Sequence, residues 1–210
     1  MSYPEILPVL PLTKSLLLPG TLVMVNAVRP GHRRLIEDVL EADGLVGLLQ
    51  PIEDEPADGF TAELYGIGCL GHIERCQETA DGYSTLLKGV VRFERLEELE
   101  PLHGYRRVRA SYERFLGDRD ELWDDEGFDR VRQELRERIA AQKLPFDLSI
   151  LDRVPGADIV NGLSQAFPMS AAERQALLEA ASVRERQDLL LAFMEMSFAR
   201  IEPYGTEQPS

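Results

Sequence analysis

The most informative segment of the chain is Leu10-Pro-Leu-Thr-Lys-Ser-Leu-Leu-Leu-Pro-Gly20. Proline fixes φ and has no backbone N–H, so the prolines of this region are typical of strand ends and edges. Pro19-Gly20 predicts the two central residues of a type II turn, because glycine accepts the positive φ that the second position requires. The stretch therefore predicts strand ends or an edge at Pro8, Pro11 and Pro19, and a short apolar run that closes in a tight turn.

The residues after this turn, as far as about residue 112, predict further strands and one helix. The apolar run Thr21 to Val28 predicts a strand. His32 to Ala42 has apolar residues at helical spacing, with Pro30 suited to the first turn and Gly44 to the C-terminal stop. The residues predicted for the buried face of this helix are Leu35, Ile36, Val39 and Leu40.

Five more segments of the first half have the pattern of strands. Leu45 to Leu49 is short and apolar, and the residues from Leu64 onward alternate with a period of two. Asp81-Gly82 is a strong hairpin signal, so we expect Tyr83 to Lys88 to return antiparallel. Gly89 predicts a bulge or bend before a separate strand. The last two predicted strands are Gly89 to Leu96 and Tyr105 to Tyr112.

Gly117 to Glu126 predicts an acidic connector, and the residues after it predict helices. One helix runs to about Lys143, and a second runs from Pro155 to Phe167. Ser170-Ala-Ala-Glu173 and Ser182-Val-Arg-Glu185 are capping boxes that open a short and a long helix. The residues predicted to face inward are Phe128, Val131, Leu135 and Ile139 in the first helix, Ile159, Val160, Leu163 and Phe167 in the second, and Leu189, Leu190, Phe193, Met196 and Ile201 in the last.

The composition excludes some classes of partner and of location. The formal net charge of the 210 residues is −14, whereas nucleic acids and anionic membranes select clustered Lys and Arg. No apolar run approaches the roughly 20 residues of a membrane helix, and no signal-peptide pattern opens the chain. We therefore expect no nucleic-acid or membrane partner, and a cytoplasmic protein with free thiols at Cys69 and Cys76.

Four segments, in this order, resemble the N-terminal substrate-binding domain of Lon proteases. They are the opening Leu10 to Gly20 stretch, Leu64 to Ile73, Gly89 to Leu96, and Ile159 to Phe198. The Gly-x-x-Arg-Phe motif at Gly89 is the most specific match, while Thr13-Lys14 stands where the family would have an acidic residue. The residues that carry the family motifs are Pro11, Pro19, Gly20, Gly68, Gly89, Arg92 and Phe93.

The resemblance implies an α+β fold in which a PUA-like β-barrel with one helix precedes a C-terminal helical bundle. We expect a β-barrel subdomain at 1–116, a helical subdomain at 117–202 and a flexible tail at 203–210. The implied function is non-catalytic recognition of unfolded or tagged proteins and peptides in protein quality control, with a separate Lon-type protease as a further partner. No Gly-x-x-x-x-Gly-Lys-Ser/Thr phosphate loop occurs, and 210 residues leave no room for a Ser-Lys protease domain. We therefore expect a stand-alone recognition domain, not an enzyme, that takes no cofactor.

Apolar side chains in and after the acidic connector are the candidate peptide-binding residues. Phe167-Pro-Met169, which we call the apolar corner, lies between two predicted helices. Such residues either seal the strands against the helices or line a hydrophobic groove rimmed by acids, which would favour neutral or basic clients. The candidates are Phe115, Trp123, Phe146, Phe167 and Met169.

Two other kinds of site have weaker support. Cys69, His72 and Cys76 are close in sequence, but strand alternation turns position 69 away from the other two, so we expect no metal. A small-molecule pocket with an aromatic cage would need several tryptophans, and Trp123 is the only one. An enzyme of unknown type stays an alternative that a buried cluster of ionisable groups in a deep pocket would favour.

Overall fold

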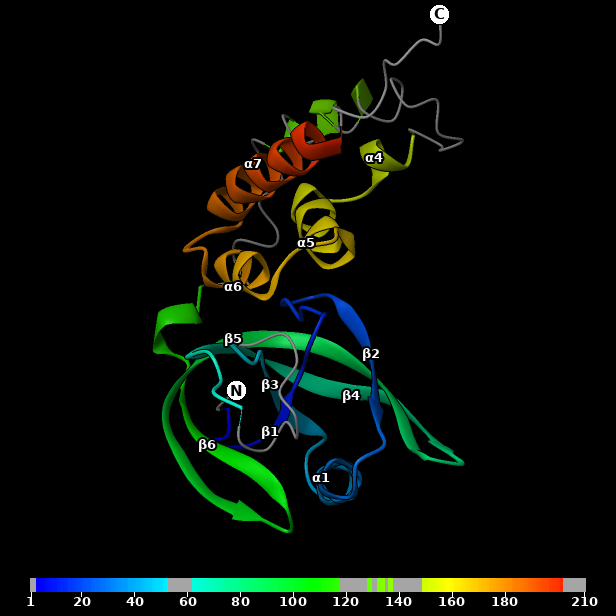
Figure 1. Cartoon of the computed structure of the whole chain (residues 1–210), viewed down its shortest axis with the longest axis vertical. Coiled ribbons are helices and arrows are strands. Elements are labelled where there is room, and N and C mark those ends of the chain that lie inside the picture. The colour runs from blue at the N-terminus through cyan, green and yellow to red at the C-terminus, as the bar shows by residue number, and fades with distance from the viewer. Residues whose placement is uncertain are drawn as a thin grey trace, which may run out of the picture.

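The computed structural model describes residues 3–52, 62–117, 128–129, 132–134, 136–137 and 149–201. In this part of the chain a layer of strands comes first and a group of helices follows it (Figure 1). The strands are β1 Ile6–Pro11, β2 Leu22–Ala27, β3 Leu45–Leu49, β4 Ile67–Thr79, β5 Gly82–Leu102 and β6 Tyr105–Ser111. The helices are α1 Pro30–Glu41, the 3-10 helix η1 Glu113–Phe115, α4 Ile150–Arg153, α5 Gly156–Ala166, α6 Ala171–Glu179 and α7 Val183–Ile201.

The six described strands form one mixed sheet in the order β2-β5-β4-β3-β1-β6. Only the β1–β3 pair is parallel. The long β5 pairs with β4 along its first part and with β6 along its second part, so the pairings run from β5 through β4, β3, β1 and β6 back to β5. This arrangement confirms the prediction of mixed α and β structure. The pairings give a barrel-like ring of strands, and a closed PUA-like β-barrel stays a prediction. β2 lies outside the ring, on β5.

The turn predicted at Pro19-Gly20 is present. Gly20 has φ 82°, and the Thr21 N–H donates to the Leu18 carbonyl at 3.0 Å, as in a type II turn. The Thr21 hydroxyl also donates to the Leu18 carbonyl, at 2.8 Å. The turn is pinned to β5, because the Gly20 N–H donates to the Gly89 carbonyl and the Gly89 N–H donates to the Thr21 carbonyl, both at 2.9 Å.

Helix α1 forms where the periodicity predicts it, but one of the four residues predicted for its buried face is exposed. Proline stands in the first turn, and Gly44, with φ 74°, donates its N–H to the Val39 carbonyl at the end of the helix. Leu35, Ile36 and Val39 are buried, but Leu40 is 48% exposed. The apolar stripe that packs on the sheet is narrower than predicted, and Leu40 lies beyond its edge.

The predicted hairpin is present, but its second strand is longer than predicted and its turn lies one residue earlier in the chain. Thr79 pairs with Gly82, so Gly82 belongs to β5 and not to the turn. A Cβ at Gly82 would lie 2.1 Å from the Ala27 carbonyl oxygen, so glycine is needed there. Gly89 does not separate two strands; β5 continues to Leu102, with a register shift beside Gly89. The bend predicted at Gly89 is therefore a β-bulge within one continuous strand, and not the end of one strand and the start of another.

The core of the ring depends on close backbone approach around Phe93, which is fully buried. Cβ atoms at Gly47 and Gly68 would lie 3.1 and 2.8 Å from the tip of the Phe93 ring. Two glycines on adjacent strands therefore make room for the aromatic ring. Buried residues around it in the same core include Leu7, Val9, Leu10, Val46, Leu48, Leu70, Val91 and Val108.

Helices α5, α6 and α7 begin close to their predicted starts, whereas α4 was not predicted, and α5 and α6 both contact α7. Both predicted serine caps are present: the Ser170 pair forms a full capping box, while Glu185 reaches back to the Ala181 N–H instead of the Ser182 N–H. Met196 was predicted to face inward but is 46% exposed, whereas Leu191 and Met194 are buried. The helix predicted before Lys143 lies largely outside the described residues, so the bundle and the bounds of the three predicted parts of the chain stay predictions.

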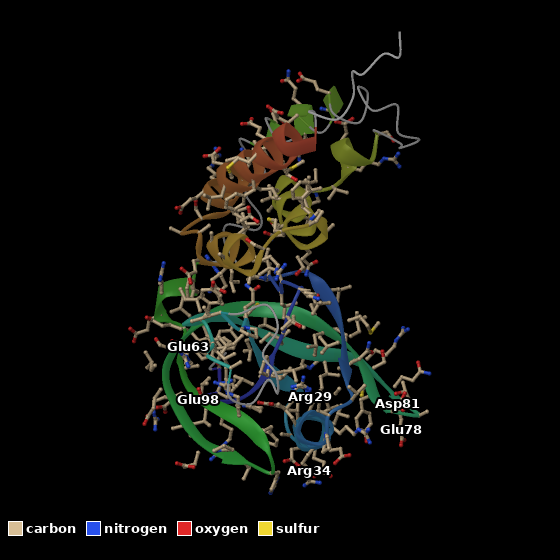
Figure 2. All side chains as sticks on the ribbon, in the orientation of Figure 1. Arg29, Arg34, Glu63, Glu78, Asp81 and Glu98 are labelled. Carbon is tan, nitrogen blue, oxygen red and sulfur yellow. The ribbon has the colours of Figure 1, made fainter. Side chains whose placement is uncertain are left out.

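A charge pair joins β5 to β6. The Glu98 carboxylate accepts from Arg106 Nε at 2.6 Å and from Arg106 Nη2 at 2.7 Å, and Arg106 is buried. The hydrogen bonds from Arg106 lower the pKa of Glu98 below its usual 4.5. Figure 2 shows Glu98 on the strand layer, at a distance from Glu78 and Asp81 at the hairpin tip.

Replacing Glu98 by glutamine should lower the free energy of unfolding at neutral pH by about 1–2 kcal/mol, because the buried guanidinium loses a charged acceptor. A carboxylate whose pKa is lower in the folded state stabilises above its unfolded pKa, and that contribution is lost as pH falls through the folded value. Chemical denaturation from pH 7 to pH 3 should therefore show a smaller acid-induced loss of stability for Glu98→Gln than for the native chain. Glu100→Gln, two residues along β5, is the matched control, and identical pH profiles for all three proteins would contradict the assignment.

Candidate binding site

The junction between strands and helices is closed by a buried arginine. Arg92 on β5 is 1% exposed, and its Nη1 donates to the Leu178 carbonyl at 2.8 Å and to the Ala180 carbonyl at 2.5 Å. The Arg92 guanidinium lies 4.5 Å from the centre of the Phe115 ring. The carbonyls at the end of α6 lack partners within the helix and carry partial negative charge, so a cation is well placed there.

A second buried arginine reaches the same helix end from α7. The Nε of Arg186 donates to the Leu177 carbonyl at 2.8 Å, and its Nη1 donates to Asn161 Oδ1 at the same distance. Asn161 on α5 is fully buried and lies 3.5 Å, through Nδ2, from the Pro19 carbonyl. The end of α6 is thus held by the sheet on one side and by α5 and α7 on the other.

Glutamines extend this polar contact along α6 and α5. Gln175 donates from Nε2 to the Ile67 carbonyl at 3.1 Å and accepts from Gln50 Nε2 at 3.0 Å. Gln165 donates from Nε2 to the Leu16 carbonyl at 2.7 Å and to the Thr21 hydroxyl at 2.9 Å. Hydrogen bonds to backbone carbonyls therefore join the helices to the strands across the junction.

The surface beside this junction is hollowed on one side of the apolar corner. A hollow of about 370 Å³ lies between the corner and α7, with Ser170, Glu173 and Ser197 at its polar parts. Met196 is 46% exposed there, and methionine adapts its shape to different apolar partners. The apolar lining consists of Phe167, Pro168, Met169, Phe193 and Met196.

A second hollow, of about 490 Å³, lies on the other side of the same corner. Its polar lining is cationic or neutral: Lys14 from the loop after β1, Arg174 from α6, and Gln165. Lys14 has φ 60°, which is uncommon for a residue other than glycine. The apolar corner is therefore a ridge between two hollows, with an acid on one side and bases on the other.

The structure brings two of the five predicted peptide-binding residues together. Phe167 and Met169 are half-buried and line both hollows. Phe115 is 2% exposed and packs against Arg92, so it seals the junction and presents no surface for a ligand. Trp123 and Phe146 lie outside the described residues.

A third hollow, of about 280 Å³, lies between α1 and the strands β1 and β6. Beside it, the Asp38 carboxylate accepts from the Tyr105 hydroxyl at 2.9 Å and pairs with His103 at 2.7 Å and Arg34 at 2.7 Å. Burial, together with the hydrogen bond to Asp38, raises the pKa of Tyr105 to about 12, and the hydrogen bond from His103 lowers the pKa of Asp38. These shifts keep Tyr105 protonated and Asp38 ionised at neutral pH, which suits a structural link and not a proton transfer.

The residues considered for a metal do not converge. Cys69 is buried and donates to the Leu70 carbonyl, His72 is exposed beside Glu74, and Cys76 lies 3.6 Å from the Thr85 hydroxyl. In the part of the chain that the structure describes, no group of three or more His, Cys, Asp or Glu side chains could hold a metal ion. Within the same residues, no helix is both long and apolar enough to cross a membrane.

The sequence matches one known protein family along most of its length. The family model described as the ATP-dependent protease La (LON) substrate-binding domain matches residues 6–196. The chain belongs to this family. Relatives of the LON substrate-binding domain include Lon protease 2 of Sorangium cellulosum, 33% identical over 89% of this chain, and Lon protease 2 of Syntrophobacter fumaroxidans, 24% identical over 95%. The chain covers 24% and 25% of those two relatives, so it spans about a quarter of their length.

Solved structures share the fold of this LON domain. A Lon N-terminal domain protein from Xanthomonas campestris matches with a TM-score of 0.62 at 23% identity, over 90% of this chain and 98% of that one. The N-terminal domain of a Mycobacterium avium complex Lon protease also gives a TM-score of 0.62, at 18% identity, over 91% and 98%. Both matches extend through strands and helices, as the predicted resemblance did.

Several of the residues predicted to carry the family motifs have structural roles close to one another. Gly89 receives the Pro19-Gly20 turn, and a Cβ there would lie 2.0 Å from the Leu18 carbonyl oxygen. Arg92 of the same Gly-x-x-Arg-Phe motif holds α6, and Phe93 fills the ring beside Gly68. The motif therefore marks the point where turn, sheet and helices meet, next to the candidate site and not inside it.

Several residues of the candidate site were not predicted as such. Phe193 and Met196 were assigned to the core by periodicity, and Lys14 was noted only as a departure from the family pattern. Gln165 and Arg174 gave no sign of their position, because a polar residue in an amphipathic helix is ordinarily solvated. Among these residues, Lys14 carries a signal of its own, because the Thr13-Lys14 pair departs from the family pattern in the loop before the Pro19-Gly20 turn.

Proposed function

We propose that this LON substrate-binding domain recognises segments of other proteins at the apolar corner and its two hollows. Family membership supports a role in substrate recognition. The observation that carries the location is the ridge of Phe167, Pro168 and Met169, which lines both hollows. An exposed apolar surface rimmed by polar groups is typical of a protein-binding site.

The mechanism is shallow hydrophobic capture. Apolar side chains of an unfolded segment enter the hollow against α7, where Phe193 and Met196 adapt to them. Residues of either charge can lie next to them, because Glu173 lines one hollow and Lys14 the other. A site of this kind discriminates by exposed apolar side chains and not by one sequence, which suits the recognition of many unfolded clients.

The finer features of the proposal follow the family. In this proposal, the strands form a PUA-like β-barrel and the C-terminal helices form a bundle. The domain is non-catalytic and works in cytoplasmic protein quality control. It delivers clients to a Lon-type protease. Affinity capture from the native cell with mass spectrometry tests the last point. Enrichment of a Lon-type protease together with misfolded proteins is expected, and recovery of neither would contradict a role in quality control.

The binding site itself is tested by a charge placed in the hollow against α7. Met196→Glu should weaken the binding of a denatured casein-like client by about tenfold or more, since burying a carboxylate among apolar side chains costs at least 1.4 kcal/mol. Isothermal titration with denatured and native clients measures both affinity and selectivity.

The matched control for this experiment is Leu96→Glu, which adds the same charge at a leucine of β5 that is 58% exposed. It should bind as the native domain does, and both variants should keep the native unfolding midpoint. Equal binding of native and denatured clients would overturn substrate capture, and equal weakening by both variants would overturn the location.

A further inference from the structure

Strand β2 ends the sheet and has one unused edge. Its pairing with β5 runs from Leu22↔Lys88 to Ala27↔Tyr83, and among the strands that the structure describes it has no second partner. In Figure 1, β2 lies on the side of the strand layer away from β6. An end strand presents a row of backbone N–H and C=O groups that another chain can pair with.

The register identifies the groups that face this edge. The Thr21 carbonyl accepts from the Gly89 N–H, so the carbonyl of residue 21 points toward β5. Backbone groups alternate in direction along an antiparallel strand. Val23, Val25 and Ala27 therefore face β5. The residues whose N–H and C=O groups face the unused edge are Leu22, Met24 and Asn26.

The edge lacks the features that usually prevent such pairing. Protective features of natural edges include a charged residue, a proline or a β-bulge. Leu22-Val-Met-Val-Asn-Ala27 contains neither charge nor proline, and its register with β5 has no shift. Leu22 and Met24 are also 51% and 57% exposed. An apolar, regular and unprotected edge favours aggregation unless it serves for binding.

The charge of the domain and the position of the β2 edge indicate which kind of chain would pair with it. A second copy would bring together two chains of net charge −14, and an acidic segment would meet the same repulsion. An extended segment that is neutral or basic is not repelled by the negative charge of this domain. The edge also begins beside the candidate site, because the Thr21 hydroxyl accepts from Gln165, which lines the hollow with Lys14.

We propose that the unused edge of β2 accepts an extended, neutral or basic segment of a client protein as an added strand. The proposal rests on the proposed function, since it assigns a second contact to the same class of ligand. Backbone pairing is independent of side-chain identity, so it would extend capture at the apolar corner to clients of many sequences.

Hydrogen exchange with a model peptide tests the edge directly. The probe is a capped peptide of about eight residues that alternates valine and threonine with a lysine at each end, a length typical of strands. At saturation, the amides of Leu22, Met24 and Asn26 should exchange at least about tenfold more slowly, with no comparable change at Val23 and Val25. The same peptide N-methylated at alternate residues cannot donate and should give no protection.

Met24→Lys, which introduces an edge-blocking charge, should weaken binding of the peptide by about fivefold or more. Leu96→Lys is the matched control and should leave the binding unchanged. If the peptide binds but slows exchange only in α5 to α7, the edge is excluded while the proposed function stands. Protection of the β2 amides without peptide, rising with protein concentration alongside a dimer mass, would assign the edge to a second copy and overturn the proposal. Absence of any binding, by peptide or denatured client, would remove both.

Discussion

Replacing Arg92 by methionine is expected to lower the free energy of unfolding by about 3 kcal/mol. The substitution keeps much of the apolar volume but leaves the Leu178 and Ala180 carbonyls without their charged donor. Each buried carbonyl left unsatisfied costs about 1–3 kcal/mol, which outweighs the gain from no longer burying the guanidinium. Denaturant unfolding followed by circular dichroism measures the loss.

Two variants make the interpretation of Arg92→Met specific. Arg92→Lys retains the charge but loses the planar fork, so about half of the loss should remain. Arg75→Met on the exposed surface of β4 removes an arginine of the same strand layer and should change stability by less than about 0.5 kcal/mol. A loss of similar size for Arg75→Met and Arg92→Met would show that the hydrogen bonds from Arg92 to the end of α6 add no specific stability.

Gly89→Ala should lower the free energy of unfolding by about 2–3 kcal/mol. The added Cβ would lie 2.0 Å from the Leu18 carbonyl oxygen and 2.7 Å from its carbon, and these are backbone atoms that cannot rotate away. The Pro19-Gly20 turn must move, and the two hydrogen bonds between it and Gly89 are strained or lost. Thermal unfolding measured by calorimetry gives the shift.

The control for Gly89→Ala is a second glycine-to-alanine substitution that should raise the free energy of unfolding instead of lowering it. Gly162 lies in α5, and a Cβ there meets nothing within 4 Å. Gly162→Ala should raise the free energy of unfolding by about 0.5–1 kcal/mol, because alanine restricts the unfolded chain and favours the helix. If Gly89→Ala proves neutral, the close approach of turn and strand is not a constraint on this fold.

The sequence predicted the elements of the fold well, because local physical chemistry determines them. The Pro19-Gly20 turn, the start and stop of α1 and the Ser170 capping box each depend on residues a few positions apart. Errors arose where distant segments meet. Periodicity could not show that Leu40 and Met196 lie beyond the packed stripe, nor that β5 continues past Gly89 through a bulge.

The candidate site was predicted only in part for the same reason. Phe167 and Met169 were identified because an apolar corner beside a proline is visible in the sequence. Phe115 could not be told from an exposed aromatic, because the residue that covers it, Arg92, is more than 20 positions away and is ordinarily a surface type. Burial of Arg92, Asn161 and Gln175 follows from contacts across the junction, which no local pattern encodes.

The way in which the helices are attached to the sheet has a consequence for exchanging parts between relatives. Arg92, Gln165 and Gln175 all donate to main-chain oxygens on the opposite element, and every residue supplies such an oxygen whatever its side chain. A chimera that takes its helices from a distant homologue should therefore assemble as long as these few donors are retained, even if most of the facing side chains differ.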